Sequence, residues 1–352
     1  MSSIRLKDFF GERVVRAIAA DLRGVYAALD STAFVTECLA GLEDLELLPR
    51  GQQIADVMRR HLPQPFAAAA HLLLAMFERP AADSGKLAGP LPESFRYLPH
   101  ALFVQSYGTD DLELALQLQY ELTQRFTAEF SIRPFLVRYP SETLARLRVW
   151  ASDPSPHVRR LVSEGTRPRL PWAPRLRAFQ ADPRPVLALL ELLRDDTALY
   201  VQRSVANNLN DIAKDHPELV VETCRRWAVG APPERRWIIR HALRSLVKRG
   251  DRRALALLGA GGRPRVRIGA LRMAPKAVRV GGALRFSLEL SSTARRTQTL
   301  LVDYVVHFVK ANGETRPKVF KLKQLVLAPG ETCTLSGKVS FQPLTTRKPY
   351  PG

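Results

Sequence analysis

The spacing of apolar residues changes once along this 352-residue chain, and that change limits the folds the chain can adopt. In the first part they recur every three or four residues, as at Val14 and Ile18, which is typical of amphipathic helices. After the segment G-A-G-G-R-P they alternate with polar residues, which indicates strands. We therefore expect a helical domain at 1–258, a linker at 259–264 and a β domain at 265–352.

The second half of the helical part contains an internal similarity. D-P-S-P-H-V-R-R-L-V (153–162) resembles D-T-A-L-Y-V-Q-R-S-V (196–205), and P-E-R-R-W-I-I-R-H-A-L (233–243) follows at a comparable interval. A period near 40 residues, built from helix pairs, is typical of HEAT-like repeats stacked into a solenoid, whose concave face tends to hold a partner. We therefore expect a mainly α protein, a HEAT-like α-solenoid followed by an all-β domain. A generic helical bundle is the alternative.

The β part reads as a series of strands separated by turns. The four strongest alternating segments are 278–290, 299–309, 318–327 and 332–341. About 90 residues with this many strands predict an immunoglobulin-like sandwich. The sequence ends at K-P-Y-P-G, where another strand would be expected. Either the natural chain extends past Gly352 and the domain is truncated here, or an irregular edge closes the sandwich.

Charge is unevenly distributed along the chain. Lys and Arg number 53 against 34 acids, a formal charge of +19, which favours a polyanionic partner such as nucleic acid. From Arg263 onward, 17 Lys and Arg face four acids. The β part therefore carries about two thirds of the excess positive charge, and we expect it to contribute to binding the polyanion.

Several function classes find little support in the sequence. No apolar run reaches the length of a membrane span, and the first ten residues lack the apolar core of a signal peptide, so we expect no membrane partner and a cytoplasmic location. The three cysteines, Cys38, Cys224 and Cys333, are far apart, and we expect buried, reduced thiols. The histidines show no ligand spacing and no nucleotide-binding motif occurs, so we expect no metal and no cofactor.

The helix predicted within V-Q-R-S-V-A-N-N-L-N-D-I-A-K-D-H-P (201–217) contains residues that are poor helix formers. At 100° per residue, Tyr200, Ser204, Asn207 and Asp211 form a polar stripe beside the apolar one. Short polar side chains in this stripe favour a surface that contacts a ligand. The alternative, equally supported, is that Asn207 and Asn208 satisfy backbone groups between repeats.

Two further segments contain candidate site residues. In Q-R-F-T-A-E-F-S-I-R-P, Glu129 lies between two phenylalanines, where its carboxylate is partly desolvated; spacing alone favours an i,i+4 ion pair with Arg133. In V-R-R-L-V-S-E-G-T-R-P-R-L-P-W, several arginines and Trp172 surround Glu164, and guanidinium groups and aromatic rings suit phosphates and bases. For Trp172 the residues alone favour a place in the core between repeats.

Together these three segments resemble the AlkC branch of the AlkC/AlkD superfamily, DNA alkylation repair glycosylases built on HEAT-like repeats. The resemblance covers nearly all of the helical part, and the predicted sandwich fits the members of that branch with an immunoglobulin-like domain. It implies a monomeric, monofunctional bacterial glycosylase of base excision repair that associates with the nucleoid when acting. It also implies hydrolysis of the N-glycosidic bond of 3-methyladenine and 3-methylcytosine in duplex DNA, without turning the base into a pocket.

The resemblance also assigns site residues. The catalytic candidates are Glu129, Glu164 and Asp211. The DNA-binding candidates are Arg159, Arg160, Arg167, Arg169, Trp172, Asn207 and Asn208. We expect Glu129 and Asp211 to stabilise a cationic sugar and activate water, and Glu164 to contact the lesion or support them.

Cations must offset the repulsion between three acids and the phosphate backbone. We expect the four candidate arginines, with Arg175 and Arg177, to form a positive rim, and the basic β domain to close on the duplex. The main alternative is a non-catalytic HEAT-repeat module that binds damaged or distorted DNA. A protein–protein scaffold explains the basic β part poorly.

Overall fold

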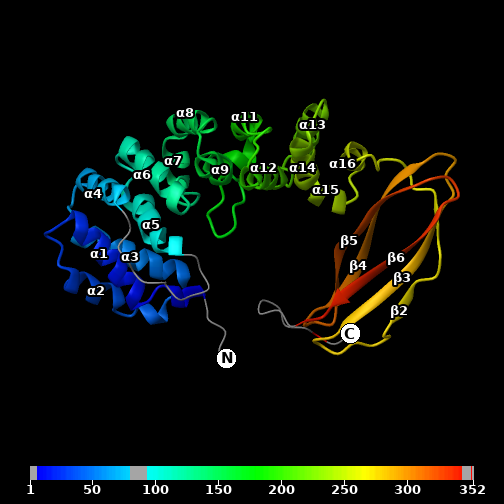
Figure 1. The fold of residues 1–352 in the computed structure, drawn as a ribbon, viewed down its shortest axis with the longest axis horizontal. Coiled ribbons are helices and arrows are strands. Elements are labelled where there is room, and N and C mark those ends of the chain that lie inside the picture. The colour runs from blue at the N-terminus through cyan, green and yellow to red at the C-terminus, as the bar shows by residue number, and fades with distance from the viewer. Residues whose placement is uncertain (1–5, 80–92, 343–349, 351–352) are drawn as a thin grey trace. The chain divides into compact units, whose positions relative to one another are not determined.

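The computed structural model describes residues 6–79, 93–342 and 350 of the chain (Figure 1). The end of the sequence, where the closure of the sandwich was left open, lies mostly outside these residues. The chain divides into two compact units, Met1–Ala242 and Leu243–Gly352. No helix among the described residues has the length and apolarity needed to cross a bilayer.

The described residues of the first unit form helices joined by loops, with no strand among them. Its helices before the site are α1 (Glu12–Val25), α2 (Ser31–Leu39), α3 (Leu47–His61), α4 (Phe66–Glu78), α5 (Leu98–Tyr107) and α6 (Leu112–Arg125), with short 3-10 helices at Leu6–Phe9, Leu42–Asp44 and Glu93–Tyr97. One apolar core joins them, built around fully buried side chains that include Phe10, Phe34 and Phe103. Proline stands in the first turn of α5, where its missing N–H costs no hydrogen bond.

The second half of this unit consists of stacked helix pairs. Its helices are α7 (Arg133–Arg138), α8 (Pro140–Trp150), α9 (Pro156–Gly165), α10 (Arg177–Ala181), α11 (Arg184–Leu192), α12 (Leu199–Ile212), α13 (Pro217–Ala228) and α14 (Pro233–Ala242). Figure 1 shows α8, α11 and α13 in one row and α9, α12 and α14 in a second row beneath them. Helix α12 packs between α9 and α14. The three similar sequence segments therefore supply three neighbouring helices of one layer, and the HEAT-like solenoid is confirmed.

The second unit begins with two short helices, α15 (Arg244–Lys248) and α16 (Arg252–Leu257), before its strands. The strands are β1 (Val266–Ile268), β2 (Arg272–Ala274), β3 (Ala283–Ser292), β4 (Gln298–Val309), β5 (Thr315–Leu327) and β6 (Thr332–Ser340). The last helix ends at Leu257 and the first strand begins at Val266, so the residues between them include the linker predicted at 259–264.

The strands form two antiparallel sheets. In one, β3 pairs with β1, β2 and β6; in the other, β4 pairs with β5, with a register shift between Val302 and Asp303. A small apolar core contains Leu290 and Leu335 from the first sheet and Leu300 and Leu327 from the second. Two sheets that share one core agree with the immunoglobulin-like sandwich that the alternation predicted.

Candidate active site

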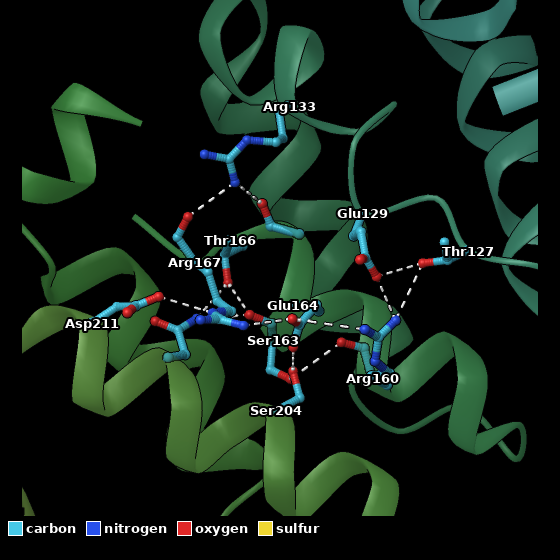
Figure 2. A network of polar contacts seen from close by, with 12 residues as sticks. Thr127, Glu129, Arg133, Arg160, Ser163, Glu164, Thr166, Arg167, Ser204 and Asp211 are labelled. Carbon is cyan, nitrogen blue, oxygen red and sulfur yellow. Dashed lines mark hydrogen bonds and ion pairs between the residues drawn. The ribbon is translucent and has the colours of Figure 1, made fainter. Parts of the chain in front are cut away.

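Three carboxylates from three separate segments gather beside the layer formed by α9 and α12. Glu129 lies in the connection between α6 and α7, Glu164 near the end of α9, and Asp211 near the end of α12. Their side chains are 13%, 8% and 3% exposed. Figure 2 shows that they follow one another in a chain of polar contacts. The three catalytic candidates are thus brought together in space.

Arg160 links the first two acids. Its Nη1 donates to Oε2 of Glu129 over 2.6 Å, and its Nη2 lies 3.7 Å from Oε1 of Glu164. The guanidinium also stacks over the ring of Tyr200, with its carbon 4.7 Å from the ring centroid. Burial alone would lower the pKa of Arg160, but the charges of Glu129 and Glu164 outweigh it and raise the pKa. This arginine is therefore a half-buried cation held by two anions.

Arg167 links the second and third acids. Its Nη1 donates to Oε1 of Glu164 over 2.7 Å, and its Nε donates to Oδ2 of Asp211 over 2.9 Å. Lys214 donates to the other oxygen of Asp211, over 2.8 Å. Burial again favours the neutral form of Arg167, but the two acids outweigh it and raise its pKa. The cluster alternates in sign along its length, which offsets the mutual repulsion of its carboxylates.

Small polar side chains complete the contacts of Glu164. The Ser204 hydroxyl donates to Oε2 of Glu164 over 2.5 Å, and Ser163 donates to Ser204 over the same distance. Asn208 donates from Nδ2 to the carbonyl of Ser163 over 2.7 Å and lies 3.1 Å from the Thr166 hydroxyl. These short hydroxyl and amide side chains bridge α9 and α12 directly.

These contacts explain the poor helix formers in the middle of α12. Ser204, Asn208, Asn210 and Asp211 are all buried, and the first two face groups of α9. Asn208 satisfies a backbone group between repeats, which was one of the two interpretations left open, because its amide donates to the Ser163 carbonyl of the neighbouring repeat. Asn207 is half-buried on the same helix. In α12, tertiary contacts outweigh intrinsic helix propensity.

The ion pair expected between Glu129 and Arg133 is wrong. Glu129 accepts from Arg160 instead, and Arg133 donates only to main-chain carbonyls in the hydrogen bonds that the structure describes for it. The i,i+4 rule requires one continuous helix. Here α6 ends at Arg125 and α7 begins at Arg133, so the two residues do not share a helix face.

The core position favoured for Trp172 by the residues alone is also wrong. The Trp172 side chain is exposed, with 72% of the residue accessible to solvent, and its backbone has a φ of 65°. This left-handed conformation is uncommon for a residue other than glycine. The loop between α9 and α10 therefore presents a large aromatic ring on the surface.

The four arginines predicted to bind DNA are all held by acids of the chain. Arg160 and Arg167 lie inside the cluster, as described. Arg159 makes two hydrogen bonds to Asp196, and Arg169 makes two to Asp215. By contrast, Arg175 and Arg177, which were expected in the positive rim, are exposed.

Sequence reasoning missed several residues of this cluster. They are Thr127, Ser163, Thr166 and Lys214, while Arg133 was expected only as the ion-pair partner of Glu129. Ser204 and Tyr200 were placed in the polar stripe of α12 but were not named as site residues. Their position in that stripe, beside Asp211, could have identified both. The described residues contain no group of His, Cys, Asp and Glu side chains able to hold a metal ion.

Comparisons with known proteins cover nearly the whole chain. A family model described as "Uncharacterised protein YhaZ, C-terminal Ig-like domain" matches residues 267–352. The uncharacterized protein YhaZ of Bacillus subtilis is 36% identical over 350 residues, which cover 99% of this chain and 93% of YhaZ. The solved structure of the Pseudomonas fluorescens alkylpurine DNA glycosylase AlkC, bound to DNA containing an abasic site analog, is similar with a TM-score of 0.90. It is 39% identical, over 99% of this chain and 93% of that chain.

Proposed function

This chain belongs to the AlkC family of DNA alkylation repair proteins with a C-terminal immunoglobulin-like domain, and from that membership we propose that it is a DNA glycosylase. Its substrates in this proposal are duplex DNA bases alkylated at N3, 3-methyladenine and 3-methylcytosine. The observation that carries the proposal is the clustering of Glu129, Glu164 and Asp211, joined by Arg160 and Arg167. A protein that only binds DNA gains nothing from carboxylates beside phosphates.

The chemistry follows from the charge of the substrate. Alkylation at N3 makes adenine cationic, so the bond from the sugar C1′ to the base is weakened before the enzyme acts. When this bond breaks, its electron pair stays with the base, which leaves as a neutral molecule, and the sugar becomes an oxocarbenium-like cation. A water oxygen then bonds to C1′ and gives its proton to a carboxylate. Carboxylates stabilise such a cation and activate water in sugar hydrolysis.

The surroundings of the three acids suggest how these tasks are divided. Glu129 is the most exposed of them, and we assign it to activating the water and stabilising the sugar cation. Both oxygens of Asp211 are already held, by Arg167 and Lys214, so its remaining lone pairs supply charge stabilisation from a fixed position. Glu164 lies between two arginines and Ser204 and supports the other two.

In this proposal the exposed groups around the cluster hold the DNA. Arg175 and Arg177 suit phosphate contacts because they are exposed, whereas Arg160 and Arg167 are committed to the acids. Trp172 offers an exposed ring that can lie against a sugar or base. The family resemblance supports an extension of the proposal, in which the damaged base leaves without being turned into a pocket.

Mass analysis of the bases released from methylated duplex DNA tests this function. We expect the purified protein to release 3-methyladenine and 3-methylcytosine with a metal chelator present and without nucleotide. The assay uses enzyme in excess at low salt, with protein-free DNA as the control for spontaneous loss. Binding of the duplex without release above that spontaneous level would favour the non-catalytic binding module instead.

A further inference from the structure

Arg133 lies at the start of α7, next to the acidic cluster but outside its ion pairs. It is 4% exposed, and its guanidinium makes four hydrogen bonds to main-chain carbonyls. Nη1 donates to Gly165 and to Arg167 over 3.1 and 2.9 Å, and Nε and Nη2 donate to Pro174 over 3.1 and 2.5 Å. Figure 2 shows the two contacts of Nη1, with the Arg133 side chain pointing toward the main chain that precedes Arg167.

These acceptors lie at the two ends of one loop. Gly165 ends α9, Pro174 precedes α10, and the residues between them include Arg167 and Trp172. A single planar guanidinium therefore joins both ends of the loop and fixes the backbone from which Arg167 reaches Glu164 and Asp211. Gly165 can lie this close to the start of α7 because it has no Cβ. A Cβ at Gly165 would lie 2.6 Å from Cγ2 of Ile132, the residue before Arg133.

The cost of this arrangement argues against simple space filling. A buried charge that donates only to neutral carbonyls loses its hydration without gaining an ion pair. Burial and the nearby charge of Arg167 lower the pKa of Arg133 to about 10. An apolar side chain would fill the same space at a lower cost, but it could not hold carbonyls on both sides of a loop.

We propose that Arg133 is a positioning residue of the glycosylase reaction, which acts by holding the 165–174 loop so that Arg167 keeps Glu164 and Asp211 in place. This inference rests on the proposed function. Arg133 touches neither the acids nor, in this account, the DNA. Because the loop also carries Trp172, some DNA affinity is lost with Arg133, but the main effect belongs in the rate of the chemical step.

The chain offers a matched control in Arg50. This residue in α3 is also 4% exposed and also makes four hydrogen bonds to main-chain carbonyls, those of Lys7, Phe10, Glu43 and Leu45. None of these carbonyls belongs to the segments that carry the three acids. Arg133→Met and Arg50→Met should therefore be similarly destabilising, and only the first should change the chemistry.

The experiment compares the two variants in the full chain at equal concentrations of folded protein. For Arg133→Met we expect the single-turnover rate of base release to fall about 10- to 100-fold, the effect of a small misplacement of catalytic groups. Affinity for undamaged duplex should fall less than the rate, and backbone amides of residues 165–176 should exchange hydrogen faster than in wild type. Arg50→Met should leave both the rate and the exchange of these amides unchanged.

Arg133→Lys serves as the second variant if Arg133→Met does not fold. Lysine keeps the charge but has one donor nitrogen, so it reaches only one side of the loop, and we expect an intermediate rate. A wild-type rate in the folded Arg133 variant, or an equal fall in Arg50→Met, would overturn the proposal. If the wild-type protein releases no base, the proposed function fails, and unchanged exchange in the loop of the Arg133 variant would separately refute its positioning role.

Discussion

Arg167 and Asp211 are 44 positions apart in the sequence, yet the Nε of the first lies 2.9 Å from Oδ2 of the second. The same guanidinium reaches Glu164, so one side chain in the loop after α9 joins two helices of the solenoid layer. Both groups of the pair are nearly inaccessible to solvent, which strengthens the attraction between them. The arrangement of the acids therefore depends on a few cations inside the cluster, and each can be tested separately.

Arg167→Met should lower stability strongly, because it leaves two buried acids without their shared partner. Breaking a buried ion pair from one side typically costs about 3–5 kcal/mol of unfolding free energy, and Lys214 offsets part of this at Asp211. The matched control is Arg169→Met, whose pair with Asp215 is roughly one quarter exposed and should be worth about 1 kcal/mol or less. Urea unfolding measures the loss of unfolding free energy in both variants. Equal losses would show that the buried ion pair stabilises the protein no more than the exposed one.

Gly165→Ala should destabilise the end of α9 by about 1–3 kcal/mol, because the new methyl group overlaps Ile132. The overlap can be tested by a double-mutant cycle. In an Ile132→Ala background the interfering methyl is gone, so the cost of Gly165→Ala should fall clearly below its cost in the wild type. The same cost in both backgrounds would mean that the contact between the two residues does not cause the loss.

The cysteines should react in an order set by burial. Burial raises the pKa of the Cys38 and Cys224 thiols to about 12, whereas Cys333 in β6 is only half-buried. The thiolate is the reactive form, so at pH 8 a thiol reagent should modify Cys333 in the folded protein and reach the other two only after unfolding. Fast reaction of all three thiols in the native state would contradict the described burial.

The β unit should contribute phosphate contacts through a groove on its first sheet. Arg285 and Lys338 lie directly opposite each other on β3 and β6, and Arg272 on β2 lies opposite Ser287, two positions along β3 from Arg285; all three are exposed and line the groove. Like charges in opposed positions repel, and an anion between them relieves the repulsion. Replacing all three with serine should reduce the slope of log affinity for duplex DNA against log salt by about 2 to 3.

The control for this measurement removes the same charge elsewhere in the unit. Arg316, Lys318 and Lys323 are exposed on β5, in the second sheet, and their replacement with serine should change the slope less. An unchanged slope in the groove variant, or an equal change in both variants, would remove the groove as the phosphate site.

The sequence predicted the helix layer correctly because its apolar periodicity and its repeat are local properties. In α12 the apolar stripe buries Val201 and Leu209. Its orientation also fixes the direction of the neighbouring polar stripe, which contains Ser204 and Asp211. The pairing of Asp211 with Arg167 was not predictable, because it depends on how two repeats pack, and spacing within one helix carries no information on that.

Two expectations were wrong for local reasons. The spacing of Glu129 and Arg133 suggested a helical ion pair, but Pro134 fits the first turn of a new helix and interrupts a continuous one. Trp172 was expected in the core because large aromatic residues are mostly buried. Its positive φ in the loop after α9 could not be inferred from the residue type, since few non-glycine residues adopt it.

The most direct test of the central claim is the single-turnover release of 3-methyladenine from methylated duplex DNA by Glu129→Gln and Asp211→Asn. The control is Asp195→Asn, which weakens the ion pair with Arg235 outside the acidic cluster. If clustered carboxylates stabilise the sugar cation, each of the first two variants should lose about 10²- to 10³-fold in rate while remaining folded, and the control should stay near wild type. Wild-type rates in both acid variants would contradict the account.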